Sequence, residues 1–155
     1  MVNLSKSKYC ALWQCPKMLW LRKYKPELAE VDSHTLSIME TGNAVGDLAM
    51  GLFGDFTEVT VYTDGEIDLS AMVRRTQEEI AKDTSVICEA SFEWNGLYCA
   101  VDILRREGDG WSIYEVKSST SDDKAVYIAD IAYQKFVLEH CGVKVTGTYL
   151  VVLDR

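Results

Sequence analysis

Two acidic residues and a lysine in the second half of the chain have the types and spacing of a divalent-cation site. Asp102 lies in the apolar run Ala-Val-Asp-Ile-Leu, and Glu115 and Lys117 lie two residues apart in the next apolar run. Mg²⁺ and similar hard cations prefer carboxylate oxygens as ligands, and Mg²⁺ keeps several of its waters. Such a site leaves room for a phosphate group. The pattern therefore indicates a bound cation that can also meet phosphate.

The strands that would position these residues are joined by two turns. Residues 86–94, 97–105 and 111–118 have the composition of strands. Asn95-Gly96 between the first two is a strong signal for a tight hairpin. The glycine-rich stretch 107–110 makes the second turn. We therefore expect three consecutive antiparallel strands.

The two turns also fix which residues face each other. In a tight hairpin the numbers of opposed residues have a constant sum, so the first turn sets Glu89 opposite Asp102. The second turn sets Asp102 opposite Glu115. Lys117 lies two residues past Glu115 and shares its face of the sheet. The sequence therefore predicts one row of three acidic side chains across three strands.

The negative charges of such a row must be balanced by a positive group. Like charges directly opposed on a sheet are destabilising, and a buried carboxylate without a partner costs free energy or shifts its pKa. The same-face neighbours are apolar, namely Ala100, Leu104 and Ile113. A divalent cation is the simplest remedy, with Lys117 as a further positive charge. The alternative is a half-exposed sheet face with a plain Glu–Lys pair, and a β-bulge would shift the register by one residue.

The rest of the chain supplies helices and one further long strand. Pro16 either kinks the first helix or begins a second one. We expect helices over 4–24, from Asp32 or Ser33 to 50, over 69–82 and over 125–140, and strands over 58–63 and 145–153. Strands that alternate with helices in this way indicate a mixed α/β fold. With no repeat or linker, residues 1–155 are predicted to form one domain.

The composition limits the cellular setting. At 155 residues and 48% hydrophobic, the chain can bury a core. No apolar run approaches the roughly 18 residues of a membrane helix, and the N-terminus lacks the apolar segment of a secretory signal. Five cysteines, an odd number, then favour reduced thiols. We predict a cytoplasmic protein without a membrane partner.

The net charge of −8 hides an uneven distribution. Residues 1–25 contain six basic residues and no acidic one, whereas the rest of the chain contains 10 basic and 24 acidic residues. A basic segment joined to an acidic body suggests an anionic partner at one end. The alternative is an ordinary solvated helix face.

Taken together, these motifs resemble the PD-(D/E)XK nuclease superfamily. Asp102 followed by Glu115-Val-Lys117 is similar to its acidic residue and Glu-x-Lys motif. The next helix carries Asp130-Ile-Ala-Tyr-Gln134, which resembles the Gln-x-x-x-Tyr motif of the RecB-type branch. That branch includes CRISPR-associated and AddB-type exonucleases. The resemblance implies an α/β fold with a restriction-endonuclease-like core, in which helices flank a mixed central sheet.

The first half of the chain extends the resemblance and also departs from it. Leu4-Ser-Lys-Ser and Cys15-Pro-Lys are similar to the segment that supplies the first cysteine of an iron–sulfur cluster in these enzymes. Gly42-Asn-Ala-Val-Gly46-Asp47 is similar to the motif on their first core helix. Many relatives carry a histidine where this chain has Gly46, and the tyrosine of Gln-x-x-x-Tyr is Leu138 here.

The cysteines are a further departure. Relatives with a cluster close it with three more cysteines near the C-terminus, and this chain has none after Cys141. An iron–sulfur cluster needs about four thiolates. We therefore expect a fragment that lacks the C-terminal cysteine region, so that Cys15 is an iron–sulfur candidate and a 4Fe-4S cluster forms only in a longer native chain. The alternative is an ordinary helix cysteine.

The resemblance implies a role for each central residue. Asp102 and Glu115 would bind Mg²⁺ or Mn²⁺ together with the backbone carbonyl of Val116. The ion would polarise the scissile phosphate and lower the pKa of a bound water. Lys117 would orient or help deprotonate that water and stabilise negative charge. Gln134 would position Lys117 or the nucleic-acid backbone, unless it is an exposed polar residue of the helix.

Further residues are peripheral candidates. Asp47 is a third catalytic or metal-binding acid, unless it is a surface helix residue. Glu89 is a metal candidate that rests on the hairpin register alone. The helical segment 1–25 would contact nucleic-acid phosphates and make binding depend on salt. Its candidate contacts are Lys6, Lys8, Lys17, Arg22 and Lys23.

The sequence therefore predicts a metal-dependent nuclease, exonuclease-like, that hydrolyses DNA in repair, recombination or defence. RNA stays open as a substrate, and a helicase or further domains of a longer chain are candidate partners. The alternative is a catalytically inactive nucleic-acid-binding or assembly module that retains the nuclease fold. A third hypothesis is an unrelated mixed α/β ligand-binding domain, in which Asp102 and Glu115 would point to opposite faces.

Overall fold

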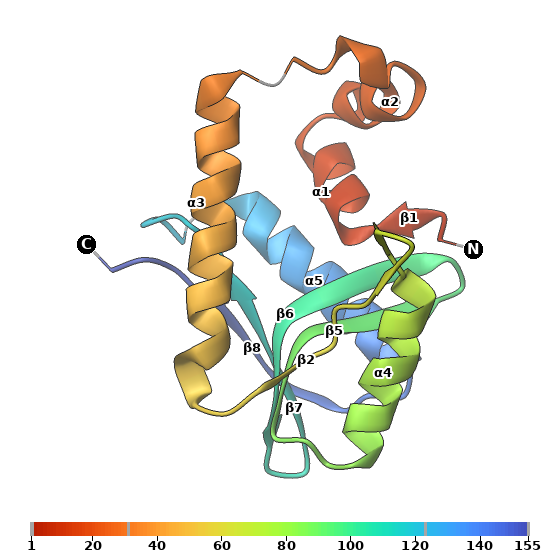
Figure 1. Ribbon diagram of the computed structural model, residues 1–155, viewed down its shortest axis with the longest axis vertical. Helices are drawn as coiled ribbons and strands as arrows, with labels where there is room; N and C mark the ends of the chain where they lie inside the picture. Colours follow the sequence, from red (N-terminus) through yellow and green to blue (C-terminus); the bar gives the residue numbers. More distant parts are fainter. Residues whose placement is uncertain (1, 31, 123, 155) are drawn as a thin grey trace.

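The computed structural model describes residues 2–30, 32–122 and 124–154 (Figure 1). Within them, five α-helices flank a mixed sheet of six strands, which confirms the predicted mixed α/β class. The strands of the sheet are β1 (Leu4–Ser5), β2 (Thr57–Glu58), β5 (Val86–Trp94), β6 (Leu97–Glu107), β7 (Gly110–Val116) and β8 (Val145–Val151). The helices are α1 (Lys6–Gln14), α2 (Pro16–Tyr24), α3 (Ser33–Met50), α4 (Leu69–Ala81) and α5 (Ala125–His140).

The sheet has the order β2-β5-β6-β7-β8, and β1 pairs with the start of β6. The strands β5, β6 and β7 form an antiparallel meander, whereas β1, β2 and β8 run parallel to their partners. Because side chains alternate along a strand, consecutive residues feed two separate apolar clusters. Helix α5 closes the larger cluster, and the C-terminal end of α3 closes the smaller one on the other side.

Both hairpin registers are as predicted. Asn95-Gly96 has φ angles of +49° and +81°, the pair of left-handed conformations that a type I′ turn requires. The residue pairs that close the two turns are Trp94 with Leu97 and Glu107 with Gly110. The alternation of apolar residues and the turn chemistry were therefore sufficient to set the pairing.

The predicted row of opposed acids is confirmed only in part. Glu89 and Asp102 fall between residue pairs that keep the predicted register, but the regular pairing is interrupted at the row itself. Glu89 has a left-handed φ of +58°, which breaks the extended backbone at that residue. The pairing of β6 with β7 ends at Ile103 and Tyr114. Asp102 and Glu115 each lie one residue beyond, where the two strands separate. We call this position the fork.

The N-terminal segment is broken in two, at the proline that the sequence marks. Residues 4–24 form β1, α1 and α2, and α2 begins at Pro16. The Ser5 side chain caps α1 by accepting a hydrogen bond from the backbone nitrogen of Lys8 at 3.4 Å. A break at this point turns α2 away from α1, as Figure 1 shows.

Two tyrosines fasten this N-terminal segment to the body of the protein. Tyr133 of α5 donates a hydrogen bond from its hydroxyl to the carbonyl of Leu4 at 2.7 Å. Tyr9 of α1 stacks on the Tyr133 ring, with the two centroids 4.9 Å apart. Together with the β1–β6 pairing, these contacts hold the start of α1 beside the fork.

The strand predicted over 58–63 is wrong. Its first residue belongs to β2, which pairs with β5, whereas Tyr62–Thr63 forms β3 in a separate hairpin with β4 (Glu66–Ile67). The intervening Asp64-Gly65 has φ angles of +53° and +83°. This tight turn pairs the segment with its own continuation and draws it away from the sheet.

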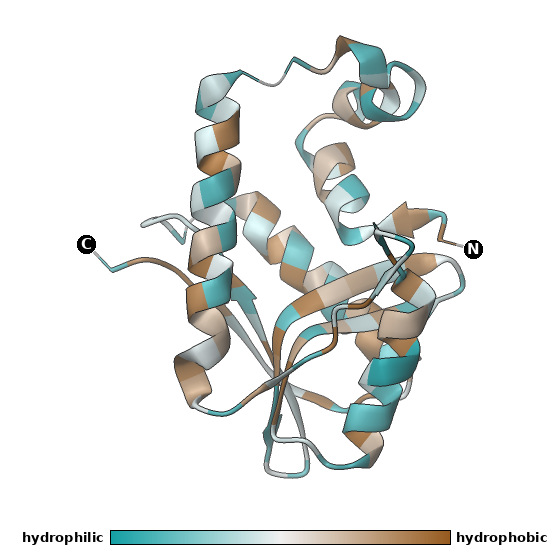
Figure 2. Cartoon of the chain, viewed as in Figure 1, coloured by the Kyte–Doolittle hydropathy of each residue, from teal (hydrophilic) through white to brown (hydrophobic). Residues whose placement is uncertain are grey.

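Helix α3 carries apolar residues that its packing leaves exposed. Asp32 caps its start by accepting a hydrogen bond from the Thr35 backbone nitrogen at 2.8 Å, as predicted. Figure 2 shows hydrophobic residues along the whole helix. The exposed ones are Leu36, Ile38, Met39 and Leu48. Of the helices in the described part of the chain, none is both long and apolar enough to cross a membrane.

Candidate functional site

The fork brings the two predicted metal ligands to one place. Asp102 accepts a hydrogen bond from the backbone nitrogen of Val116 at 2.7 Å, in the position that a neighbouring strand would otherwise fill. Glu115 is almost completely buried, with 1% of its surface exposed. The two carboxylates do not lie on opposite faces, because both are within 4 Å of the same Lys6 ammonium.

Helix α5 supplies a buried hydrogen-bond donor for Glu115 and a second buried acid beside it. Gln134 donates from Nε2 to Glu115 Oε2 at 2.6 Å and to Asp130 Oδ1 at 2.9 Å. Asp130 and Gln134 are four residues apart, so both point from the same side of α5. Gln134 is fully buried, so the exposed-residue alternative is wrong. Its Oε1 has no hydrogen-bond partner among the described residues.

Asp130 is a site residue that the sequence argument did not select. It lies in the same motif as Gln134. In the sequence, however, an acidic residue within a helix looks the same whether it is buried or exposed to solvent. Its burial, with 3% of its surface exposed, separates it from the many acidic residues on this chain's surface. That burial follows from the packing of α5 on the sheet, which local sequence does not encode.

Lys117 is held between two acids. Its Nζ donates to Glu115 Oε1 at 2.6 Å and to Asp130 Oδ2 at 2.8 Å. Because both partners are buried and fixed by Gln134, the ammonium has a defined position at the end of β7. The predicted proximity of Glu115 and Lys117 is therefore present in the structure.

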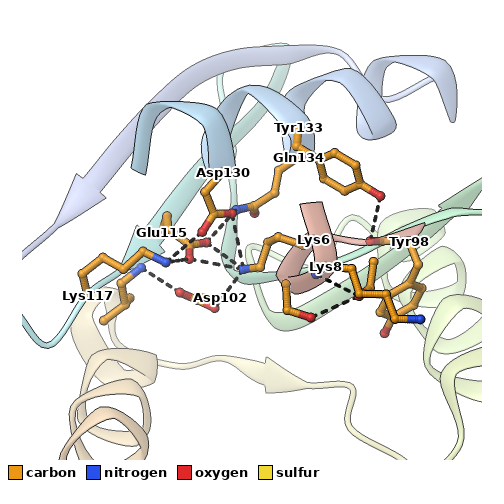
Figure 3. A network of polar contacts seen from close by, with 12 residues as sticks. Lys6, Lys8, Tyr98, Asp102, Glu115, Lys117, Asp130, Tyr133 and Gln134 are labelled. Atoms are coloured by element: carbon orange, nitrogen blue, oxygen red, sulfur yellow. Dashed lines mark hydrogen bonds and ion pairs between the residues drawn. The ribbon is translucent and has the colours of Figure 1, made fainter. Parts of the chain in front are cut away.

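Lys6 lies in the same group, which differs from its predicted role as an exposed phosphate contact. Its Nζ donates to Glu115 Oε2 at 3.0 Å and Oε1 at 3.2 Å. It lies 3.8 Å from Asp102 Oδ1 and 3.9 Å from Asp130 Oδ1 (Figure 3). The group, which we call the polar cluster, consists of Lys6, Asp102, Glu115, Lys117, Asp130 and Gln134. The role of Lys6 in this cluster was not predicted, because the six basic residues of the N-terminal segment were treated as one patch.

The polar cluster sets the charge states of its acids. Burial raises the pKa of Glu115, but attraction to Lys6 and Lys117 outweighs it and lowers the pKa to about 2. Burial raises the pKa of Asp102 to about 6, although Lys6 acts in the opposite direction. Burial lowers the pKa of Lys6, and attraction to Glu115, Asp102 and Asp130 more than reverses this. Glu115 is thus ionised, whereas burial acts against the charged form of Asp102.

A pocket of about 340 Å³ opens beside the polar cluster. Helix α3 forms one wall and the fork forms the other, and the lining residues are Gly42, Asn43, Gly46, Asp47, Met50, Glu89, Asp102, Glu115, Val116 and Lys117. Asp47 and Glu89, the two peripheral metal candidates, thus reach the same pocket. A Cβ at Gly46 would meet no atom within 4 Å, so this wall is open. Burial, with Asp102 nearby, raises the pKa of Glu89 to about 7.

The donor set at the fork fits a hard divalent cation. Asp102 and Glu115 offer carboxylate oxygens, which are ligands that Mg²⁺ and Mn²⁺ accept, and Val116 lines the same pocket. The chain itself directs the positive Lys6 ammonium to the two carboxylates, so a cation is favoured there. Within residues 2–30, 32–122 and 124–154, no three acidic, histidine or cysteine side chains form a ready metal-binding group. Such a site would therefore use two carboxylates and waters.

The remaining predicted residues lie outside the polar cluster. Lys8, Lys17, Arg22 and Lys23 are exposed on α1 and α2. Cys15 is exposed at the junction of these two helices. As no metal-binding group is present among the described residues, the structure gives Cys15 no partners for an iron–sulfur cluster.

Comparisons with protein-family models, with curated proteins and with solved structures find no match to this chain. The case for a function therefore rests on two independent observations. One is the set of sequence motifs, and the other is the convergence of their residues at a single pocket.

Proposed function

We propose that this chain is a metal-dependent nuclease of the PD-(D/E)XK type that hydrolyses phosphodiester bonds in DNA, with an exonuclease-like mode of action. The observation that carries the proposal is the convergence of Asp102, Glu115 and Lys117 at one pocket, with Gln134 behind them. That residues named from motifs on β6, β7 and α5 lie together supports the proposal.

In this proposal Asp102, Glu115 and the carbonyl of Val116 hold Mg²⁺ or Mn²⁺. When bound, the ion supplies Lewis-acid activation of the phosphate and of a water. Gln134 fixes the Glu115 carboxylate through the 2.6 Å hydrogen bond to Oε2, so this ligand needs no reordering. Asp47 and Glu89 bring two further carboxyl groups to the pocket wall, which favours a cation over a bare phosphate.

Lys117 is the residue that acts on the reacting atoms. Its ammonium is oriented by Glu115 and Asp130 and lines the pocket. A fixed positive charge there stabilises the negative charge that develops on the phosphate oxygens, without the cost of ordering it during the reaction. Asp130 is a positioning residue, because it holds Lys117 and Gln134 at once.

The exposed basic residues of α1 and α2 are proposed to contact nucleic-acid phosphates. Replacement of all three basic residues of α2 by alanine should weaken DNA binding. It should also reduce the slope of the logarithm of the binding constant against the logarithm of the salt concentration by about one per lost phosphate contact. These residues are Lys17, Arg22 and Lys23. Fluorescence anisotropy at several salt concentrations measures both quantities.

A matched control removes three exposed lysines from other elements, namely Lys82, Lys135 and Lys144. The proposal expects this control to bind DNA with the wild-type salt dependence, apart from a small uniform effect of net charge. Equal weakening by both triple variants would show that α2 is an ordinary solvated face.

The second candidate is the catalytically inactive nucleic-acid-binding or assembly module. The observation in its favour is the Lys6 ammonium, which already compensates Glu115 and approaches Asp102. The open wall at Gly46 is consistent with either candidate. For both, we propose a cytoplasmic setting, since all five cysteines are free. A helicase or further domains of a longer chain are the proposed partners.

Hydrolysis assays separate the two candidates. End-labelled single-stranded and double-stranded DNA and RNA are incubated with the protein in Mg²⁺, Mn²⁺, Ca²⁺ or a chelator. The nuclease proposal expects stepwise release of labelled nucleotides with Mg²⁺ or Mn²⁺ and none with the chelator. Binding of DNA without hydrolysis in every metal would instead favour the inactive module.

A further inference from the structure

The Lys6 side chain lies between the two carboxylates to which the metal ion is assigned. Its Nζ is 3.0 Å from Glu115 Oε2 and 3.8 Å from Asp102 Oδ1. In Figure 3 it points from the start of α1 toward both groups. Lys117, by contrast, forms its ion pairs with Glu115 and Asp130, at 2.6 and 2.8 Å. Lys6 is therefore the lysine that links the two proposed metal ligands.

The backbone of Lys6 is fixed, whereas its side chain is partly exposed. The preceding two residues pair with β6, and Leu4 accepts a hydrogen bond from Tyr133. The Lys6 side chain keeps 19% of its surface exposed, so it has a route to solvent. A lysine ammonium sits on a flexible four-carbon stem. The charge can therefore leave the carboxylates without undocking the N-terminal segment.

An ammonium and a divalent cation cannot share this position. Two positive charges a few ångströms apart repel strongly where burial lowers the effective dielectric constant. Each cation, however, is attracted by the same pair of carboxylates. We propose that the Lys6 ammonium and a divalent cation are alternative counter-ions of Asp102 and Glu115, so that Lys6 lowers the metal affinity of the free protein. This inference rests on the proposed function, because it takes these two acids as metal ligands.

As a consequence, the Asp102 and Glu115 carboxylates keep the Lys6 ammonium as their counter-ion when no metal is bound. The apparent affinity of the metal is reduced by the fraction of molecules in which Lys6 has left. When the Lys6 charge is removed, every molecule can bind the metal without first displacing an ammonium, so the metal should bind more tightly. A merely structural role for Lys6 predicts the opposite, because loss of a supporting contact would loosen the ligands and weaken metal binding.

Calorimetric titration of Mn²⁺ into the metal-free protein tests this inference. Lys6→Met should bind Mn²⁺ about tenfold more tightly than wild type, or more. Lys8→Met is the matched control, since Lys8 lies two residues further along α1 and is exposed, and it should bind as wild type does. Lys6→Arg keeps the positive charge and should stay close to wild type. The rise in Tm on addition of Mn²⁺ should also be larger for Lys6→Met than for wild type.

The possible outcomes separate this inference from the proposed function. Equal or weaker Mn²⁺ affinity in Lys6→Met, with clear binding by wild type, would overturn the competition and leave the metal site standing. Absence of Mn²⁺ binding by both proteins would overturn the competition and the proposed function together. If Lys6→Met does not fold, Lys6→Gln takes its place with the same expectation, because it is neutral yet still able to donate a hydrogen bond to Glu115.

Discussion

Replacement of Lys117 by alanine is expected to slow Mg²⁺-dependent or Mn²⁺-dependent DNA hydrolysis by about 10²–10³-fold or more, while the protein stays folded. Loss of a single preoriented charge or donor at the reacting phosphate has an effect of this size. Lys117 lies at the end of β7 rather than in the apolar core, so its removal leaves the core contacts intact. Single-turnover assays on end-labelled DNA, together with circular dichroism, measure the two effects.

Lys124→Ala is the matched control for Lys117→Ala. The Nζ atoms of both lysines lie 5.4 Å from the centroid of the Tyr127 ring. Lys117 alone of the two forms ion pairs with Glu115 and Asp130 among the contacts of the described residues. The control should therefore hydrolyse DNA at close to the wild-type rate. Undiminished hydrolysis by Lys117→Ala would remove this lysine from the mechanism.

Leu104→Ala is expected to lower the free energy of unfolding by about 2–5 kcal/mol. Leu104 is fully buried and pairs directly with Ile113 on β7, two residues from the fork. Truncation here leaves a cavity between the sheet and α5 that the close-packed surroundings cannot fill. Urea denaturation followed by circular dichroism measures the loss.

Leu48→Ala makes the same chemical change on α3, where the leucine is 79% exposed. Surface substitutions of this kind change stability by about 0.5 kcal/mol or less. If the two variants lost equal stability, the assigned core would be wrong. Because the pair formed by Leu104 and Ile113 supports the fork, Leu104→Ala should also lose DNA hydrolysis at temperatures at which wild type is still active.

Sequence information was sufficient where local chemistry determines structure. Asn95-Gly96 set the first hairpin register because its two left-handed residues are those that a type I′ turn needs. The boundaries of β5 and α5 also follow from apolar pattern and flanking residues. Such signals act over a few residues and do not depend on the rest of the fold.

The separation of β6 and β7 at the fork could not be predicted from turn chemistry and apolar pattern. The register calculation assumes that the pairing continues along the strands, whereas the pairing of β6 with β7 ends at Ile103 and Tyr114, although β6 pairs with β5 on both sides of Asp102. The left-handed Glu89 breaks the neighbouring strand at the same level. Glu89 and Asp102 therefore lie opposite each other at an interruption of the pairing, and Asp102 and Glu115 lie just past the end of the β6–β7 pairing.

Lys6 and Asp130 were missed for a related reason. Lys6 contacts Glu115 and Asp130 contacts Lys117 across more than ten residues of sequence, so only the docking of α1 and α5 on the sheet brings them together. A basic segment and a helical acid have ordinary solvated roles in most chains. Their burial beside opposite charges is a tertiary property that composition cannot express.

A crystal structure of the wild-type protein grown with Mn²⁺ is the most direct test of the central claim, that the fork holds a catalytic metal ion. We expect an anomalous scattering peak that marks a Mn²⁺ ion bonded to carboxylate oxygens of Asp102 and Glu115. The Lys6 ammonium should have moved out from between them. A structure without a peak at the fork at saturating Mn²⁺, in which Lys6 still bridges the two carboxylates, would contradict the claim.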